Sequence, residues 1–217
     1  MYLFPLVGII IGILIGGLAY EVSFYLRPAL VGLLVTCALI IITGVNHMDG
    51  LADFADGLMA NGNKEAKHNA MLDPAVGSAG VAAVVLYIIG MIIAISSFHY
   101  GLKLLTGIIV AEVIAKYAMV LQAYRGLSAW EGFSVPFTIS MKDSQKMLAS
   151  TGIMLPIVLV IGSYVGLVAL GVSLVITMVM QYTSNKIFGG ISGDMLGALN
   201  EITRLSSLIV LSSVTIL

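Results

Sequence analysis

Residues 78–98 read SAGVAAVVLYIIGMIIAISSF, an uninterrupted apolar run without a charged side chain. Crossing the hydrocarbon core of a bilayer takes about 17–25 such residues as a helix, because only a helix or a closed barrel satisfies its own backbone there. The run is continuous and lacks the alternation that marks a transmembrane barrel strand. It therefore predicts a membrane-spanning helix.

Apolar runs of this kind recur along the chain and predict seven spans, at residues 3–20, 28–45, 78–98, 102–124, 147–165, 168–184 and 199–217. A tight hairpin near Gly166 to Gly171 separates the fifth from the sixth, although one long tilted helix, which would leave six spans, stays open. Gly8, Gly12 and Gly16 predict a face on which helices approach closely. We expect an all-α, polytopic helical bundle that forms a single domain over residues 1–217, with short cytoplasmic helices and loops.

The composition agrees with this architecture. The chain is 59% hydrophobic and 10% charged, whereas soluble domains are about half apolar and about a quarter charged. A chain with so few charges must have much of its surface covered by lipid. Its net charge of −1 and the lack of a basic stripe argue against nucleic acid as a partner. Its single cysteine, Cys37, excludes an intrachain disulfide and a thiolate metal site.

Polar residues gather in three segments, 46–77, 125–146 and 185–201, which seven spans place on the same side of the membrane. The cations in these segments are Lys64, Lys67, Arg125, Lys142, Lys146 and Lys186. The loops on the opposite side carry Arg27 and Lys103. The positive-inside rule therefore predicts a multi-pass protein of the cytoplasmic membrane, with the three segments and the N-terminus in the cytoplasm.

The segment after the second apolar run, residues 46–58, reads NHMDGLADFADGL. Asp49, Asp53 and Asp56 stand at i, i+4 and i+7, so a helix places all three within an arc of about 60°. Like charges at this spacing repel and destabilise a helix, and no lysine or arginine lies in the segment. A hard divalent cation, Mg²⁺ or Mn²⁺, would neutralise them. The segment predicts a metal site, with a solvated acidic face as the alternative.

Two further patches carry candidate site residues. Asp73 precedes Pro74 just before the third span, which predicts a helix cap, a further metal ligand or a general base. Residues 189–194 read GGISGD and predict a flexible loop able to present backbone N–H groups to a phosphate, with Asp194 at the start of the last helix.

Other polar side chains have two interpretations each. Glu112 and Lys116 stand at i and i+4 within the fourth span, where ionisable groups usually pair and face the interior; they predict either a bridge or a substrate contact. His47 is a candidate base or a structural residue. Lys186 is placed to meet a diphosphate or to anchor the interface. Trp130, the only tryptophan, is predicted to anchor the membrane interface.

These motifs resemble those of the cobalamin synthase family, adenosylcobinamide-GDP ribazoletransferase, which completes the nucleotide loop of vitamin B12. The family's LDGLADxxDG signature is similar to MDGLADFADG at residues 48–57, and its MxDxxxGxxG element to MLDPAVGSAG at residues 71–80. Its GGxTGDxLGA element is similar to residues 189–198, with Ser192 in the threonine place. FPLVG at residues 4–8 looks like the family's first span.

The resemblance implies a Mg²⁺-dependent membrane phosphotransferase that joins α-ribazole, or its 5′-phosphate, to adenosylcobinamide-GDP and releases GMP. Active-site segments 46–80, 125–146 and 185–201 would face the cytoplasm. The implied metal ligands are Asp49, Asp53, Asp56 and Asp73, and the candidate bases are Asp73, Asp194 and His47. The implied substrate contacts are Asn46, Glu112, Lys116, Lys186, Gly189, Gly190, Ser192 and Gly193. Partners are the two substrates and the lipid bilayer, with a homo-oligomer left open.

Two rival functions are less favoured. Residues 53–60 match the first part, DxxDGxxA, of the CDP-alcohol phosphotransferase motif, but Asn61 replaces the expected arginine and the later GxxxDxxxD is absent. An ion-coupled transporter would hold its cation near the membrane midplane on broken helices, whereas these aspartates are expected at a membrane edge.

Overall fold

The computed structural model of the chain describes residues 1–98, 101–132 and 134–213, and within these ranges it is built from α-helices. The helices are α1 (Phe4–Val22), α2 (Pro28–Thr43), α3 (Asn46–Met59), α4 (Lys64–Leu72), α5 (Ser78–Ser96), α6 (Gly101–Arg125), α7 (Ser134–Ser140), α8 (Ser144–Val160), α9 (Ser163–Ile187) and α10 (Gly193–Ser213). The predicted all-α fold is confirmed, and the aspartate segment is the helix α3.

Four of the described helices, α1, α5, α6 and α9, are long and apolar enough to cross a membrane. Helices α2 and α3 meet that criterion only as a pair, which is bent by 93°, and α8 is a shorter apolar helix. About a third or less of the apolar stretch of α1, α5 and α9 is buried, against 83% for α6. The first three therefore turn apolar faces outward, as lipid contact requires, and α6 lies inside the bundle.

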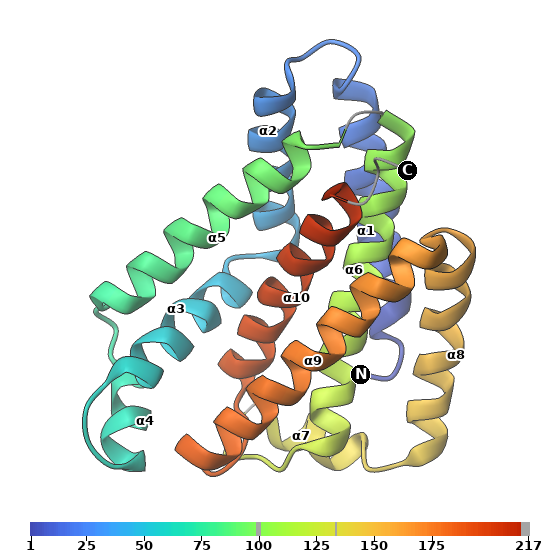
Figure 1. Cartoon of the computed structure of the whole chain (residues 1–217). Coiled ribbons are helices and arrows are strands. Elements are labelled where there is room, and N and C mark those ends of the chain that lie inside the picture. The colour runs from blue at the N-terminus through green and yellow to red at the C-terminus, as the bar shows by residue number, and fades with distance from the viewer. Residues whose placement is uncertain (99–100, 133, 214–217) are drawn as a thin grey trace.

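Helix α10 crosses the middle of the bundle, where it packs against α3, α5, α6 and α9 (Figure 1). It does not meet the apolar criterion because it carries Asn200, Glu201 and Arg204, and all three are buried. Polar side chains in such a helix are tolerated when they face protein and find partners there.

The connection between the fifth and sixth predicted spans confirms two separate helices, but its turn lies earlier than expected. Helices α8 and α9 are separate and turn at residues 161–162, before the Gly166 to Gly171 stretch. Gly166 lies inside α9, where a Cβ atom would come 2.8 Å from the carbonyl oxygen of Val158. This glycine therefore lets the two helices approach closely, while the turn itself falls a few residues earlier.

The other predicted spans coincide with helices to within a few residues, except the last. Helix α10 already begins at Gly193, ahead of the predicted start at residue 199. Residues 214–217 of that predicted span lie outside the described residues.

Helices α1 and α6 approach closely along Gly8, Gly12 and Gly16, as their spacing predicted. A Cβ atom at Gly12 would come 2.6 Å from the Cα atom of Ile109, and one at Gly8 would come 2.8 Å from the carbonyl oxygen of Glu112. Glycine is needed because any side chain at these positions would meet the backbone of α6.

Substituting Gly12 tests this contact. Gly12→Ala should lower the free energy of unfolding by about 1–3 kcal/mol, since the new methyl group must displace the α6 backbone. Thermal unfolding in detergent measures the loss. Gly17→Ala is the matched control in the same helix, because a Cβ atom there meets no atom within 4 Å. The control should keep or raise stability, and equal melting temperatures for the two variants would contradict the packing argument.

Candidate active site

The polar segments meet at one end of the bundle, here called the polar end, which carries α4, α7 and the α9–α10 connection (lower part of Figure 1). The Ala129 N–H donates to the Ile191 carbonyl oxygen at 2.9 Å, and the Ile191 N–H donates to that of Leu127 at 2.8 Å. The His68 ring of α4 stacks on Trp130 with ring centroids 3.7 Å apart. The structure thus brings the three sequence-predicted segments together.

Helix α3 lies directly against the start of α10 through two glycines. A Cβ atom at Gly50 would come 2.7 Å from the carbonyl oxygen of Asp194, and one at Gly197 would come 3.1 Å from the Cα atom of His47. Larger residues at either position would push the helices apart. The close crossing brings Asp194 of α10 to the aspartate face of α3.

The carboxylates at this crossing repel one another. Burial, together with the charges of Asp49, Asp194 and Asp56, raises the pKa of Asp53 to about 6. In the described part of the chain, no group of three or more His, Cys, Asp or Glu side chains is arranged to hold a metal ion by itself. The donor set still fits Mg²⁺, which usually binds one or two protein carboxylates and completes its shell with substrate phosphates and water.

Asp56 has a structural task that the sequence did not reveal. Its carboxylate accepts hydrogen bonds from the N–H groups of Gly77, at 2.7 Å, and Gly80, at 2.8 Å, at the start of α5. A Cβ atom at Gly80 would come 2.5 Å from that carboxylate. The GxxG spacing of residues 77–80 therefore serves to receive Asp56 and fix α3 to α5. Its predicted metal-binding role stays a prediction.

Asp73 lies at the C-terminal end of α4, on the α5 side of the polar end. Its exposed carboxylate accepts a hydrogen bond from the Ala75 N–H at 2.9 Å, so it stabilises the turn into α5. It shares a cavity of about 290 Å³ with Asp56. The charges that act on the pKa of Asp53 come from Asp49, Asp56 and Asp194, and Asp73 is not one of them.

The glycine-rich loop makes close contacts with its neighbours. Gly189 has φ 90°, a conformation that favours glycine. Gly190 is buried, and a Cβ atom there would come 2.5 Å from the carbonyl oxygen of Leu127. The Ser192 hydroxyl, also buried, donates to the Asp194 carboxylate at 3.3 Å. The loop therefore holds Asp194 in place.

Lys186 is not the cation nearest to this loop. It is exposed on α9, where its Nζ atom lies 5.8 Å from the centroid of the Tyr182 ring. Lys64 instead places its Nζ atom 3.3 Å from where a Cβ atom of Gly189 would stand. Lys64, which in the sequence stands out only as a loop cation, thus reaches the glycine loop.

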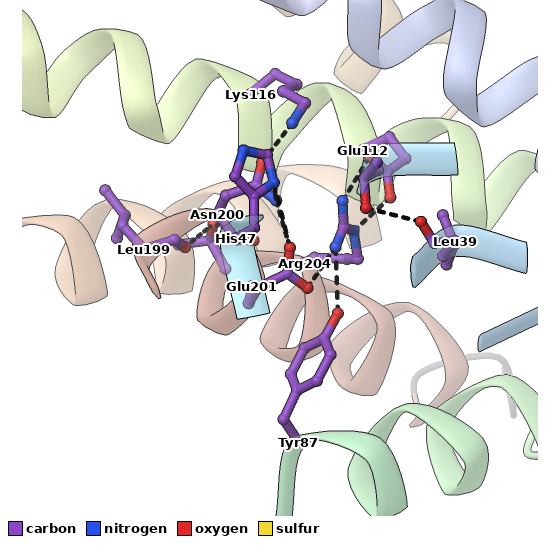
Figure 2. Close-up of polar contacts among 11 residues, drawn as sticks. Leu39, His47, Tyr87, Glu112, Lys116, Leu199, Asn200, Glu201 and Arg204 are labelled. Atoms are coloured by element: carbon purple, nitrogen blue, oxygen red, sulfur yellow. Dashed lines mark hydrogen bonds and ion pairs between the residues drawn. The ribbon is translucent and has the colours of Figure 1, made fainter. Parts of the chain in front are cut away.

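A network of buried ionisable side chains lies on the inner side of the α3–α10 crossing. Arg204 makes hydrogen bonds to several of its members (Figure 2). Its guanidinium donates to both carboxylate oxygens of Glu112, to Glu201, and to the Tyr87 hydroxyl at 3.2 Å. Glu112 is therefore paired with Arg204, which corrects the alternative of a bridge to Lys116.

Lys116 and His47 extend the network toward α3. The Lys116 ammonium donates to the Asn200 side-chain oxygen at 3.0 Å, and the Asn200 amide donates to Glu201 at 2.9 Å. The Nδ1 atom of His47 lies 3.3 Å from that amide nitrogen and 3.5 Å from Glu201 (Figure 2). Sequence reasoning missed Arg204. Three polar residues at i, i+1 and i+4 in one span were the signal, because ionisable groups there need partners.

Two cavities adjoin the carboxylates of the crossing. The valine groove, of about 470 Å³ between α3 and α5, is lined by Val45, Val76, Val81, Val84 and Val85 with Asn46, Met48, Asp49 and Ala52. The Trp130 cavity, of about 460 Å³, is lined by His68, Leu72, Trp130, Glu131, Gly132, Ser134, Ser192, Gly193 and Asp194. The predicted interface anchor, Trp130, is thus part of a cavity wall at the polar end.

Comparisons with known proteins agree with the arrangement of these motifs. A family model described as cobalamin-5-phosphate synthase matches residues 1–212. The chain is similar to proteins named adenosylcobinamide-GDP ribazoletransferase. The protein of Pyrococcus abyssi is 33% identical over 215 residues, which cover 98% of this chain and 87% of the relative. The protein of Methanococcoides burtonii is 32% identical over 220 residues, which cover 97% of this chain and 81% of the relative. No solved structure matches the chain.

The buried network yields a prediction for stability. Arg204→Leu should lower the free energy of unfolding by about 3–5 kcal/mol, because Glu112 and Glu201 would stay buried without their cation. Unfolding by heat or denaturant in detergent measures this. Arg125→Leu, at an exposed arginine, should change stability little. Combining Arg204→Leu with Glu112→Gln and Glu201→Gln should restore part of the loss, and failure to do so would contradict charge pairing as its cause.

Proposed function

The chain belongs to the cobalamin-5-phosphate synthase family, and we propose that it transfers the cobinamide-phosphate group of adenosylcobinamide-GDP to α-ribazole or its 5′-phosphate, releasing GMP. The names of its relatives support this reaction. The structural observation that supports the site is the crossing of α3 and α10, which gathers Asp49, Asp53 and Asp194 between two cavities. The family match disfavours a CDP-alcohol phosphotransferase or a transporter.

The reaction is a phosphoryl transfer. The acceptor's ribose hydroxyl oxygen forms a bond to the phosphorus that carries cobinamide, and the bond from that phosphorus to the bridging oxygen of the diphosphate breaks. GMP leaves with the bridging oxygen, and a base takes the hydroxyl proton. Such a reaction asks a protein mainly for positioning and for neutralisation of charge.

We assign the metal ligands to Asp49 and Asp53 and the base to Asp194. A Mg²⁺ ion held there would neutralise the charge on the diphosphate. Asp194 suits the base because it lies at the crossing beside Asp53, where the phosphates of the donor would be held. Ser192 donates a hydrogen bond to Asp194 and so orients its carboxylate.

The valine groove suits the corrinoid part of the donor. It is mostly apolar, opens between α3 and α5, and has Asp49 in its wall. A large amphiphilic substrate could therefore lie in the groove with its phosphate at the carboxylates. Lys64, near the glycine loop, adds positive charge on the side from which the phosphates would arrive.

We also propose that seven helices cross the bilayer, with the polar end in the cytoplasm. These helices are α1, α2, α5, α6, α8, α9 and α10. The arrangement supports this count because the buried polar residues of α10 are covered by its neighbours, so the helix needs no continuous apolar surface of its own.

The reaction and its metal ligand are tested together. Purified protein in detergent, given adenosylcobinamide-GDP, α-ribazole and Mg²⁺, should release one GMP per corrinoid joined, which chromatography measures. Asp53→Asn should slow turnover about 100-fold while the protein stays at least as resistant to unfolding, because a repelling charge is removed. Glu65→Gln, at an exposed carboxylate of α4, should be unaffected.

Three outcomes would count against this proposal. Wild-type protein that releases no GMP would exclude the reaction, and equal rates with and without divalent cation would exclude the metal. Near-normal turnover by Asp53→Asn would exclude that ligand.

Orientation is tested by labelling single cysteines in a Cys37→Ala background. Cysteines at Asn63, Ser144 and Asn185, all exposed at the polar end, should resist a membrane-impermeant reagent in intact cells and react in inverted vesicles. A cysteine at Ser97, exposed at the other end of α5, should react in intact cells. The opposite pattern would place the polar end outside.

A further inference from the structure

The Trp130 cavity has an aromatic wall held in a defined orientation. His68 stacks on Trp130 with an interplanar angle of 26°, and Phe188 meets the Trp130 ring edge-on with ring centroids 6.4 Å apart. These contacts tie together α4, the 128–132 segment and the end of α9. An aromatic surface fixed in this way is suited to stacking against a planar base, and about 460 Å³ lies within the range of ligand pockets.

The same cavity carries an exposed carboxylate beside the tryptophan. Glu131 follows Trp130 directly and lines the cavity. A carboxylate accepts hydrogen bonds only, and its two oxygens can receive two donors side by side. A planar ligand with two adjacent N–H donors on one edge is therefore the complementary partner.

The position of the cavity relates it to the phosphates. Asp194 lines the cavity and acts on Asp53 across the crossing of α3 and α10. A nucleotide whose base lay against Trp130 would therefore direct its phosphates toward the carboxylates. The valine groove, with Asp49 in its wall, adjoins the same carboxylates from the side of α5.

We propose that the Trp130 cavity binds the guanine base of the donor substrate, with Trp130 and His68 as the stacking wall and Glu131 as the acceptor for the guanine N1–H and 2-amino groups. The inference rests on the proposed function, because that reaction supplies a guanosine diphosphate group. It assigns opposite sides of the crossing to the two halves of the donor, the corrinoid to the valine groove and the nucleotide to the Trp130 cavity.

The carboxylate favours guanine over the base of the acceptor. The benzimidazole of α-ribazole is attached to ribose through one ring nitrogen, and its other ring nitrogen carries a lone pair without a hydrogen. Glu131 would find no donor on it. Guanine presents two adjacent donors, so Glu131 distinguishes guanine from benzimidazole and also from hypoxanthine, which lacks the 2-amino group.

The fluorescence of Trp130 reports on this cavity directly, because the chain has one tryptophan. Purified full-length protein in detergent with Mg²⁺ is titrated with GMP, IMP and α-ribazole, with excitation at the red edge of tryptophan absorption. We expect GMP to quench the emission and IMP to bind about tenfold more weakly, the usual effect of losing one hydrogen bond to a charged group. We expect no saturable quenching by α-ribazole.

Variants identify the residue responsible. Glu131→Gln should bind GMP and IMP with nearly equal affinity and raise the KM for adenosylcobinamide-GDP about tenfold, with the KM for α-ribazole unchanged. Glu65→Gln, the matched exposed carboxylate on α4, should keep the preference for GMP. Thermal unfolding should show that both variants are folded.

The outcomes separate this inference from the proposed function. Saturable quenching by α-ribazole, no quenching by GMP, or an unchanged preference for GMP in Glu131→Gln would overturn the guanine site even if wild-type protein releases GMP normally. If GMP quenches more strongly than IMP and Glu131→Gln abolishes this preference, the guanine site is supported even if the transfer reaction fails. If wild-type protein turns over but binds GMP no better than IMP, the proposed function is supported and the guanine site is refuted.

Discussion

The positive charge of Arg204 in the interior of the bundle is the constraint on which the rest of the structure depends. A buried guanidinium must find carboxylates and hydrogen-bond acceptors or the fold loses several kcal/mol. Arg204 finds Glu112 on α6, Glu201 on its own helix and Tyr87 on α5. Because these partners come from different helices, they fix both the position of α10 along its axis and its rotation about that axis relative to α5 and α6. Asp194 lies about 15 Å earlier on the same helix, so the network also sets where that carboxylate stands.

Close glycine contacts turn this framework into a site. Gly50 and Gly197 let α3 and α10 touch, which brings Asp194 to the face that holds Asp49 and Asp53. Gly80, together with Gly77, receives the carboxylate of Asp56 at the start of α5. The glycines of the aspartate motifs thus have packing roles. They determine the distances between carboxylates that come from two different helices, α3 and α10.

The carboxylate crossing is the place where local stability and function conflict. Asp49, Asp53 and Asp194 lie together, and burial together with the charges of the neighbouring carboxylates raises the pKa of Asp53. Natural proteins break the rules of local stability mainly at functional sites. Two different cavities adjoin these carboxylates. The valine groove is mostly apolar, and the Trp130 cavity is aromatic and polar. A donor with a corrinoid half and a nucleotide half needs both surfaces around one diphosphate.

The sequence by itself determined the helices, the aspartate face of α3 and the glycine face of α1. These features depend on neighbours within a few turns, where hydrophobic runs and i, i+4 spacing decide the outcome. It also identified the family through motifs at residues 48–57, 71–80 and 189–198. It misplaced the α8–α9 turn, because glycines that permit close helix packing and glycines that form turns look alike in a sequence.

Only the tertiary structure decided which polar groups meet. Glu112 has Lys116 one turn away on the same helix, yet its partner is Arg204, 92 positions along the chain. Asp56 shares a helical face with Asp53, yet its carboxylate is taken by α5. Trp130 is of the residue type that commonly anchors a membrane interface, yet it forms a cavity wall with His68. Each choice is made by the packing of helices remote in sequence, because a charge or ring in a low-dielectric interior binds whichever complementary group the packing places beside it.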